Sequence, residues 1–328
     1  MSAVIEKKIK VNTKIRPFKK YEAPQANNQF LPKLWFSLLS SSAKNTGKTY
    51  NIIQLLTAYE HSGFTQDGEK CEMRTIWFSG STATSKNNAI ISTLKSLDPE
   101  DIYDINKDNV GKLQEVYNDC LNEKQEIEKY VEYEQAFKRW KEVGEDKLTE
   151  LELLILDERD FVAPRNLLDK PKYKRPRVIF MVFDDLLNNP LVFGYKRANF
   201  INQTIILHRH DAQNRVPINI LLISQSFKSV PTLVRRQIDY FVMLKNANRT
   251  KLLQNIEDEV GGIVGMKDLE RLYDHAMEVE YGALIVSIHP ADKIKFRLSW
   301  DKELTLGDDK LCDCVSKGKP FGSCGKTK

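Results

Sequence analysis

The sequence of 328 residues contains no run of about 18 apolar residues, so we expect no membrane-spanning helix. Its first residues are polar and charged and lack the apolar core of a signal peptide. The five cysteines are odd in number and scattered, which argues against a disulfide framework and favours a reducing compartment. With 41% hydrophobic and 29% charged residues, the composition indicates a globular protein of one large α/β domain or two small ones.

Several kinds of catalytic and metal site are also missing. The five histidines show no His-Glu-x-x-His spacing, and no Gly-x-Ser-x-Gly nucleophile elbow occurs. A structural zinc ion needs four ligands, whereas Cys312, Cys314 and Cys324 supply three, with no fourth ligand nearby. We therefore expect neither a zinc protease, nor an α/β-hydrolase triad, nor a zinc-stabilised tail.

Positive charge is concentrated near the amino end, although the net charge of the chain is only +5. Residues 1–33 contain eight Lys and Arg residues against two Glu, and residues 170–176 form a second basic segment. Both segments are candidates for contact with nucleic-acid phosphates, and a solvated tail would have the same composition. We expect a basic N-terminal arm at 1–32, a folded domain at 33–300 and a C-terminal tail at 301–328.

Residues 108–160 differ in character from the rest of the chain. Apolar and aromatic residues between Val116 and Trp140 recur at helical spacing among many Glu and Lys residues. Gly144 and its neighbours interrupt this pattern before a second helical stretch at 148–156. The pattern predicts a helical hairpin inserted in the core domain, which fits a surface helix pair without chemistry and also a partner-binding element.

Short apolar runs alternate with helical patterns over the remainder of the chain. The expected strands are 34–39, 75–78, 177–183, 218–223, 240–244 and 283–288. Strands that alternate with helices are typical of a parallel, doubly wound sheet. The predicted fold class is therefore α/β, with a mostly parallel sheet flanked by helices.

The sharpest local motif is Ser42-Ala43-Lys44-Asn45-Thr46-Gly47-Lys48-Thr49, which lies between an expected strand and an expected helix. It matches the spacing of a Walker A phosphate-binding loop, whose backbone N–H groups surround phosphates at a helix N-terminus. Lys48 would contact the β- and γ-phosphates of ATP, and the Thr49 hydroxyl would bind Mg²⁺. Ser42 occupies the position of the first glycine, so the start of the loop must accommodate a side chain.

A phosphate-binding loop also needs carboxylates for the metal ion and the attacking water. Asp184 and Asp185 directly follow an apolar run, at the strand end where ligands bind in such sheets. We assign Asp184 to Mg²⁺ and Asp185 to polarisation of the water. Asp157 and Glu158 compete for this assignment, but the leucines before them have helical spacing.

A second Gly-Lys-Thr sequence occurs at 325–327. Only one residue follows it, so no helix can form there, and we reject it as a phosphate-binding loop.

Polar residues further along the chain complete the candidate site. Gln225 ends an expected strand and would sense the γ-phosphate or orient the water. Arg209, Arg235 and Arg236 are each candidates for an arginine that acts in trans on the nucleotide of a neighbouring subunit. The sequence does not choose among these three, and each also fits an ordinary surface or salt-bridging arginine.

The order and content of these motifs resemble the FtsK/HerA superfamily of P-loop, RecA-like ATPases. More closely, they resemble the poxvirus-type genome-packaging ATPases of large double-stranded DNA viruses and virophages. The resemblance covers roughly residues 33–245 and rests on four places: Ser42–Thr49, Val182–Leu186, Arg209–Gln225 and Val230–Tyr240.

The resemblance implies ATP and Mg²⁺ as cofactors and ATP hydrolysis coupled to movement of double-stranded DNA, independently of its sequence. It supports the assigned roles of Lys48, Thr49, Asp184, Asp185 and Gln225, and a trans role for one of Arg209, Arg235 and Arg236. A homo-oligomeric ring and viral capsid components are the implied partners, with no membrane. The implied location is the host cytoplasm, a virus factory or the virion.

Two other interpretations stay open at this point. One is a nucleotide-binding assembly factor that does not move DNA. The other is a helicase or translocase of the same superfamily with a different role.

Overall fold

The computed structural model describes residues 24–80, 89, 91–105, 110–186, 199–210, 214–260 and 262–306. Most of the basic arm, most of the C-terminal tail, the cysteines Cys312, Cys314 and Cys324, and the second Gly-Lys-Thr sequence lie outside these residues. Among the helices of the described ranges, none is long and apolar enough to cross a membrane.

The core is a large, mostly parallel sheet. Its strands are β2 (Ser37–Ser41), β5 (Met73–Ser79), β6 (Ile102–Asp104), β7 (Val178–Asp184), β8 (Ile218–Ser224), β9 (Tyr240–Met243), β10 (Leu284–Ser287), β11 (Phe296–Leu298) and β12 (Lys302–Glu303). Their order is β12-β11-β10-β9-β2-β8-β7-β5-β6. The strands from β9 to β6 in this order pair in parallel, whereas β10, β11 and β12 extend the sheet antiparallel. The α/β fold with a mostly parallel sheet is thus confirmed.

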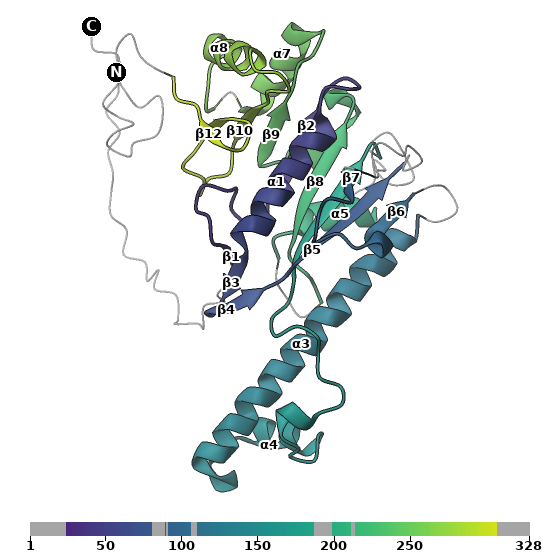
Figure 1. Cartoon of the computed structure of the whole chain (residues 1–328), viewed down its shortest axis with the longest axis vertical. Coiled ribbons are helices and arrows are strands. Elements are labelled where there is room, and N and C mark those ends of the chain that lie inside the picture. Colours follow the sequence, from purple (N-terminus) through teal and green to yellow (C-terminus); the bar gives the residue numbers. More distant parts are fainter. Residues whose placement is uncertain are drawn as a thin grey trace, which may run out of the picture.

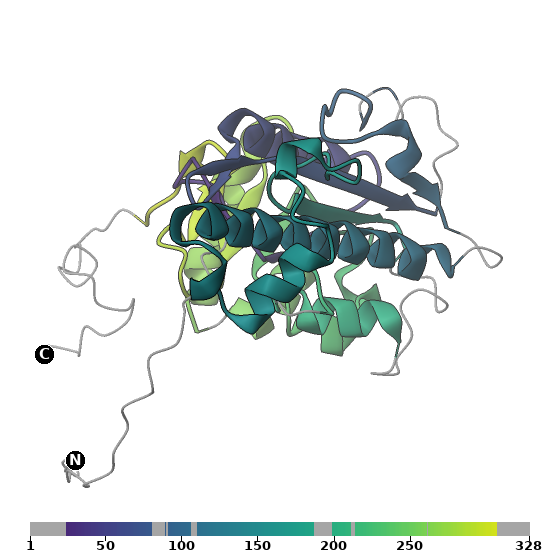
Figure 2. The ribbon, with the colours of Figure 1, turned by 90° about the horizontal axis from the view of Figure 1, so that it is seen from below.

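Helices cover both faces of this sheet, which explains why its central strands are continuous apolar runs. They are α1 (Lys48–Ser62), α3 (Lys112–Val143), α5 (Phe200–Leu207), α6 (Thr232–Arg235), α7 (Arg249–Val260) and α8 (Met266–Met277). Alternate residues of β7 point to opposite faces: Phe180 packs in the cluster with α1, and Met181 in the cluster with α5 to α8. Figures 1 and 2 show α1 and α5 on opposite sides of the sheet.

Two local features differ from the sequence prediction. The strand predicted at 34–39 starts before the observed strand. Trp35 has a φ of 64°, and its N–H donates to Asn219 Oδ1 at 2.7 Å, so it is not part of the strand. Strand β2 therefore starts at Ser37 and ends directly before Ser42. A small antiparallel sheet of β1 (Gln25–Ala26), β3 (Phe64–Gln66) and β4 (Glu69–Cys71) was not expected at all.

The expected helical hairpin is present, but its two arms are unequal. Helix α3 has 32 residues and α4 (Glu150–Asp157) has 8. Gly144, with a φ of 80°, follows the end of α3, and Thr149 and Glu152 form a capping box at the start of α4. The hairpin has a small core of its own, made by Tyr133, Ala136 and Leu156. Figure 1 shows that it projects from the end of the sheet opposite to the N-terminus of α1.

The described residues also form short 3₁₀ turns. They are η1 (Pro99–Asp101), η2 (Glu145–Lys147), η3 (Pro164–Asn166) and η4 (Phe227–Ser229).

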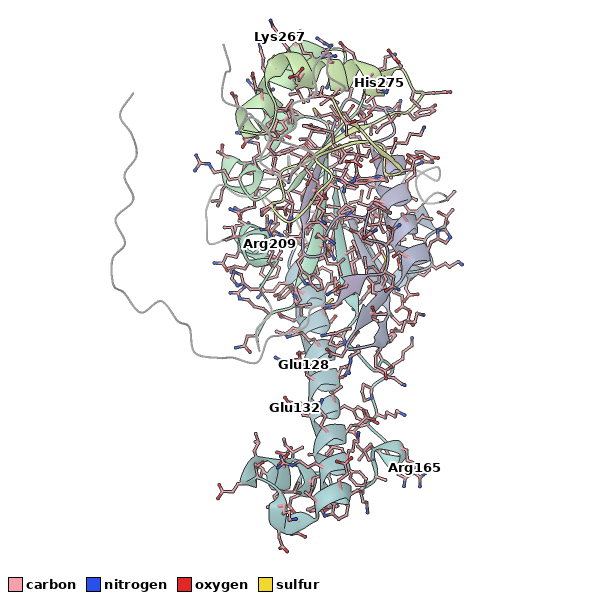
Figure 3. The ribbon with its side chains drawn as sticks, turned by 90° about the vertical axis from the view of Figure 1, so that its left-hand side faces the viewer. Glu128, Glu132, Arg165, Arg209, Lys267 and His275 are labelled. Carbon is pink, nitrogen blue, oxygen red and sulfur yellow. The ribbon has the colours of Figure 1, made fainter. Side chains whose placement is uncertain are left out.

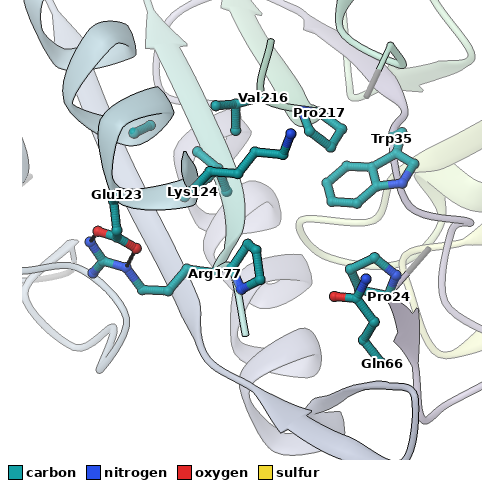
Figure 4. Close-up of a pocket in the computed structure, with 11 residues that line it drawn as sticks. Pro24, Trp35, Gln66, Glu123, Lys124, Arg177, Val216 and Pro217 are labelled. Atoms are coloured by element: carbon teal, nitrogen blue, oxygen red, sulfur yellow. Dashed lines mark hydrogen bonds and ion pairs between the residues drawn. The ribbon is translucent and has the colours of Figure 1, made fainter. Parts of the chain in front are cut away.

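Buried charge pairs fix the place where α3 leaves the body. Arg74 pairs with Asp101 at 2.7 Å, and Arg177 pairs with Glu123 of α3 (Figure 4). The Lys124 side chain is only 5% exposed and lies 3.4 Å from Glu128. Because removal of one partner from a buried pair leaves an uncompensated charge, the contacts of Arg74 and Arg177 with Glu123 of α3 hold the base of the helix in one orientation. Figure 3 shows Glu128 and Glu132 on the part of α3 that extends beyond this base.

Candidate functional site

The candidate phosphate-binding loop connects β2 directly to α1. Gly47, with φ 93° and ψ 16°, is the residue before the first turn of α1, and this left-handed conformation favours glycine. Asn45 also has a positive φ, of 59°, which asparagine tolerates better than most residues. The backbone N–H groups of Ala43 to Gly47 have no hydrogen-bond acceptor in the described part of the chain. Free N–H groups at a helix N-terminus are the chemistry that binds phosphate.

Ser42 fits the position where the Walker A motif has its first glycine. It is fully buried and is not among the residues with a positive φ, so the backbone there does not require glycine. Its Oγ lies 2.7 Å from Thr46 Oγ1 and donates to the Lys245 carbonyl at 3.1 Å. The serine thus ties both ends of the loop to the residues that follow β9.

Replacement of Ser42 with Gly should destabilise the protein without improving nucleotide binding. The variant loses the hydroxyl hydrogen bonds and gains backbone freedom in the unfolded state, so we expect a free energy of unfolding lower by about 1–2 kcal/mol. Urea unfolding measures this change, and titration with a non-hydrolysable ATP analogue measures affinity. Ser42→Ala is the control that removes only the hydroxyl. Tighter nucleotide binding by Ser42→Gly would show that the serine hinders the loop.

Lys48 bends back over the loop. Its Nζ donates to the Ser42 carbonyl at 2.8 Å and also to the Ala43 carbonyl. Burial lowers the pKa of Lys48, and the nearby carboxylates of Asp184 and Asp185 partly oppose this effect. Phosphate oxygens in the loop would give this ammonium group anionic acceptors in place of two neutral carbonyls.

The two candidate carboxylates lie at the carboxyl end of β7. Asp184 is the last residue of the strand, and Asp185 turns the chain with a φ of 57°. The Asp185 N–H donates to the Ile223 carbonyl of β8 at 3.1 Å. Gln225, which follows β8, donates from Nε2 to Asp185 Oδ2 at 2.6 Å. Two residues that the sequence suggested separately therefore form one hydrogen-bonded unit.

The strand order places this unit beside the loop. Strand β8 lies between β2 and β7, so Gln225 follows the strand that separates Ser42 from Asp184. Burial and, to a smaller extent, the neighbouring Asp185 raise the pKa of Asp184 to about 6, and Lys48 partly opposes this rise. Any additional cation nearby would favour the charged form of the Asp184 carboxylate.

The protein groups present fit a magnesium ion bound together with a nucleotide. Within the described ranges, no three His, Cys, Asp or Glu side chains are grouped to hold a metal on their own. Mg²⁺ is usually held by one or two protein groups, water and substrate phosphates. The Asp184 carboxylate and the Thr49 hydroxyl, which lies in the first turn of α1, could provide the two protein groups.

Arg209 lies away from this site, at the amino ends of the strands. It pairs with Asp239, a buried residue just before β9. Asp239 Oδ2 in turn accepts from the N–H of Ser37, the first residue of β2, at 2.9 Å. Figure 3 places Arg209 on the flank of the body between α8 and the hairpin. The structure therefore does not bring Arg209 to the phosphate-binding loop of its own subunit.

The other two arginines lie at the end of α6 and differ in their contacts. The Arg235 guanidinium lies 5.2 Å from the centre of the Phe227 ring and 3.5 Å from Glu259. Arg236 is exposed and has no ion pair with any described residue. Of the two, only Arg236 has a guanidinium group without a charged partner in the described part of the subunit.

The competing carboxylates are separated from the loop. Asp157 is the last residue of α4, and Glu158 follows it, so both belong to the projecting hairpin. The expected helical stretch before them is confirmed.

One residue beside the loop was missed by sequence reasoning. Tyr281, in the turn between α8 and β10, lies so close that a Cβ atom at Gly47 would be 3.4 Å from its ring and 3.7 Å from Leu244. No motif or periodicity marks Tyr281, since its relation to the loop exists only in the folded chain.

Neither a protein-family model nor a curated protein matches this sequence. Several solved structures match this one over most of its length, with TM-scores below 0.5. B204, the DNA-packaging ATPase from Sulfolobus Turreted Icosahedral Virus, has a TM-score of 0.42 and 12% identity over 83% of this chain and 99% of that chain.

The genome-packaging NTPase B204 from Sulfolobus turreted icosahedral virus 2, in complex with AMPPCP, has a TM-score of 0.41 and 13% identity over 80% and 96% of the two chains. ATPases 2 and 3 of EssC from Geobacillus thermodenitrificans have a TM-score of 0.43 and 10% identity over 86% and 43%. Roles for individual residues therefore rest on the geometry of the site itself.

Proposed function

We propose that this chain hydrolyses ATP and couples hydrolysis to movement of double-stranded DNA, as the motor that packages a viral genome into a capsid. The observation that carries the proposal is the site at the carboxyl edge of the sheet. There, the loop Ser42–Thr49 presents N–H groups that have no acceptor among the described residues, and Lys48, beside Asp184 and the Asp185–Gln225 pair. The motif order described from the sequence supports the DNA-packaging part of the proposal.

Some of these residues bind the nucleotide and the metal ion, and others activate the attacking water. The loop N–H groups and Lys48 hold the β- and γ-phosphates, and Thr49 and Asp184 hold the metal ion. Mg²⁺, when bound, neutralises charge on the phosphates. Asp185 orients the attacking water and accepts its proton. The hydrogen bond from Gln225, which follows β8, fixes the Asp185 carboxylate for this role. The water oxygen bonds to the γ-phosphorus as the bond to ADP breaks.

A ring of identical subunits would complete each site with a residue from its neighbour. Arg209 and Arg235 are engaged within their own subunit, by Asp239 and by Glu259 respectively. We assign the trans role to Arg236, which is exposed and free of ion pairs in the described part of the subunit. A guanidinium group at that position would stabilise the charge that develops on the transferred phosphate.

The basic linker is our candidate for DNA contact. Arg175 is used internally, since it pairs with Asp67 at 3.8 Å and its side chain is 19% exposed. Lys170, Lys172 and Lys174 are exposed and follow the hairpin. Lys174 lies 3.8 Å from Glu69, but its side chain is 81% exposed, so solvent and DNA can reach it. The three lysines precede β7, so they lie towards the amino ends of the strands, away from the nucleotide site. The N-terminal arm would add further positive charge.

Duplex DNA should stimulate ATP hydrolysis, and the stimulation should weaken strongly as salt rises. Contacts to phosphates release counterions, so each lost lysine contact reduces the slope of log affinity against log salt by about 0.9. Replacement of Lys170, Lys172 and Lys174 with Ser should reduce this slope by up to about 3 and leave the DNA-free rate unchanged. The rate is measured with and without linear DNA from 50 to 200 mM salt, a range in which such binding falls by orders of magnitude.

The other interpretations predict different outcomes. A nucleotide-dependent assembly factor would hydrolyse or bind ATP without any response to DNA. DNA stimulation without association with capsid precursors would indicate a helicase or a translocase of another role.

A further inference from the structure

A large groove runs along the outer face of α1 and begins at the phosphate-binding loop. Its volume is about 1060 Å³. One wall consists of α1 residues from Tyr50 to His61, and the other comes from the turn at 279–281 and from residues 298–302. Gly47 lies at the end of the groove nearest to the loop. A ligand bound in the loop can therefore continue into this groove.

The positions of Asp184 and Gln225 indicate how a nucleotide would lie across the loop. Asp184 ends β7 and Gln225 follows β8, and both strands lie on one side of β2. The γ-phosphate must face these residues if they act on it. The remainder of the nucleotide then extends to the other side of β2, where β9 and β10 lie and where Tyr281 precedes β10.

Exposed aromatic rings lie where the nucleotide would continue. Tyr281 is 61% exposed and Tyr50 is 50% exposed, and both line the groove next to Gly47. Aromatic rings of this size are usually at least partly buried, and an exposed pair beside a binding loop offers flat surfaces for a planar ligand. Trp300, which also lines the groove, is fixed by a hydrogen bond from its Nε1 to the Asn51 carbonyl at 2.8 Å.

The backbone holds Tyr281 in this place. Its φ is 56°, a conformation that few residues adopt without a tertiary reason. The next residue, Gly282, donates its N–H to the Val279 carbonyl at 2.9 Å, and a Cβ atom there would lie 2.1 Å from the Ala276 carbonyl. Only glycine fits at 282, so the turn directs the preceding ring towards the loop.

We propose that the end of this groove next to Gly47 binds the purine base of the nucleotide, stacked on the ring of Tyr281 with Tyr50 beside it. The inference rests on the proposed nucleotide site and adds its base-recognition element. Stacking on an aromatic ring depends on the size of the base and little on its hydrogen-bonding groups. The site therefore accepts ATP and GTP alike and binds pyrimidine nucleotides more weakly.

Two ligands separate recognition of the base from recognition of the phosphates. The first is a non-hydrolysable ATP analogue with Mg²⁺, and the second is inorganic tripolyphosphate with Mg²⁺. Tyr281→Asn removes the ring and keeps a residue that tolerates a positive φ. We expect it to weaken binding of the ATP analogue about 5- to 100-fold, the effect of losing one stacked base, and to leave tripolyphosphate binding unchanged.

Two control variants show whether the ring itself is responsible. Tyr281→Phe keeps the ring and should bind the analogue within about twofold of the native protein. Phe30→Asn removes an aromatic side chain that is 60% exposed and does not line the groove, so it should bind both ligands normally. In steady-state hydrolysis, Tyr281→Asn should raise KM for ATP and leave kcat unchanged.

Any other result would contradict the inference that the base stacks on Tyr281. An equal loss of both ligands in Tyr281→Asn would mean that the ring only supports Gly47, and unchanged binding of both would mean that the base lies elsewhere. In those two cases the nucleotide site stands. Failure of the native protein to bind either ligand would reject the nucleotide site as well.

Discussion

Lys48→Ala should lower kcat/KM for ATP by at least about 1000-fold, which corresponds to about 4 kcal/mol of transition-state stabilisation. The ammonium group of Lys48 already contacts two carbonyls of the loop, those of Ser42 and Ala43. Its charge is therefore held where the β- and γ-phosphates would lie. Preorganised charge of this kind contributes more than charge that must be moved into place during the reaction.

The variant should remain folded, which separates loss of chemistry from loss of structure. Burial lowers the pKa of Lys48, so the protein environment disfavours the charged form, and its removal costs little stability. We expect thermal unfolding close to that of the native protein. The measurement is steady-state ATP hydrolysis with and without duplex DNA.

Two further variants control this experiment. Lys48→Arg keeps the charge but replaces a compact ammonium with a planar fork, so it should also be strongly impaired. Lys95→Ala removes an exposed lysine outside the site and should have native activity. Native turnover by Lys48→Ala would reject Ser42–Thr49 as the nucleotide site.

The parts of the site that the sequence predicts are those that depend on neighbouring residues. The loop between β2 and α1 and the carboxylates at the end of β7 follow from local patterns of apolar runs and charged ends. Ser42, by contrast, is explained by its bond to Lys245, which lies 203 positions away in the chain. The bond from Gln225 to Asp185 and the position of Tyr281 beside Gly47 likewise exist only after the strands are ordered in the sheet.

For the fold, too, local features could be predicted from the sequence and long-range ones could not. An apolar run at 283–288 predicts a buried strand, but it carries no information about direction, and β10 is antiparallel to β9. The leucines of α4 have helical spacing, and the helix is present. Yet Leu151 and Leu154 are 65% and 57% exposed, because spacing does not say whether anything covers a helix face.

Asp184→Asn should abolish most ATP hydrolysis and at the same time stabilise the protein in the absence of nucleotide. The substitution removes a metal-binding carboxylate, for which we expect a loss of about 100- to 1000-fold in kcat. Burial and the neighbouring Asp185 raise the pKa of Asp184 from its ordinary value of 3.8 to about 6. The charged form is thus disfavoured in the folded state, and a neutral amide avoids that cost.

The size and pH dependence of the stabilisation follow from this shift in the pKa of Asp184. Its protonated form contributes stability that is fully present below about pH 4 and is lost as pH rises through about 6. One unit corresponds to about 1.4 kcal/mol, and solvent reaches part of the carboxyl, so we expect a gain of about 2 kcal/mol for Asp184→Asn at pH 8. The gain should appear between pH 4 and 6 and stay constant above.

Thermal and urea unfolding of both proteins from pH 4 to pH 8 measure this difference. Addition of Mg²⁺ with an ATP analogue should stabilise the native protein more than Asp184→Asn, because the stability added by a bound ligand grows with the logarithm of its affinity. Asp157→Asn, on the exposed end of α4, should leave activity and stability unchanged and tests the competing carboxylate. If Asp184→Asn were less stable than the native protein at pH 8, the carboxylate would hold the fold together. A metal-binding site, by contrast, requires a buried acid that is needed for turnover even though its charge weakens the fold. The bound cation offsets the cost of that charge.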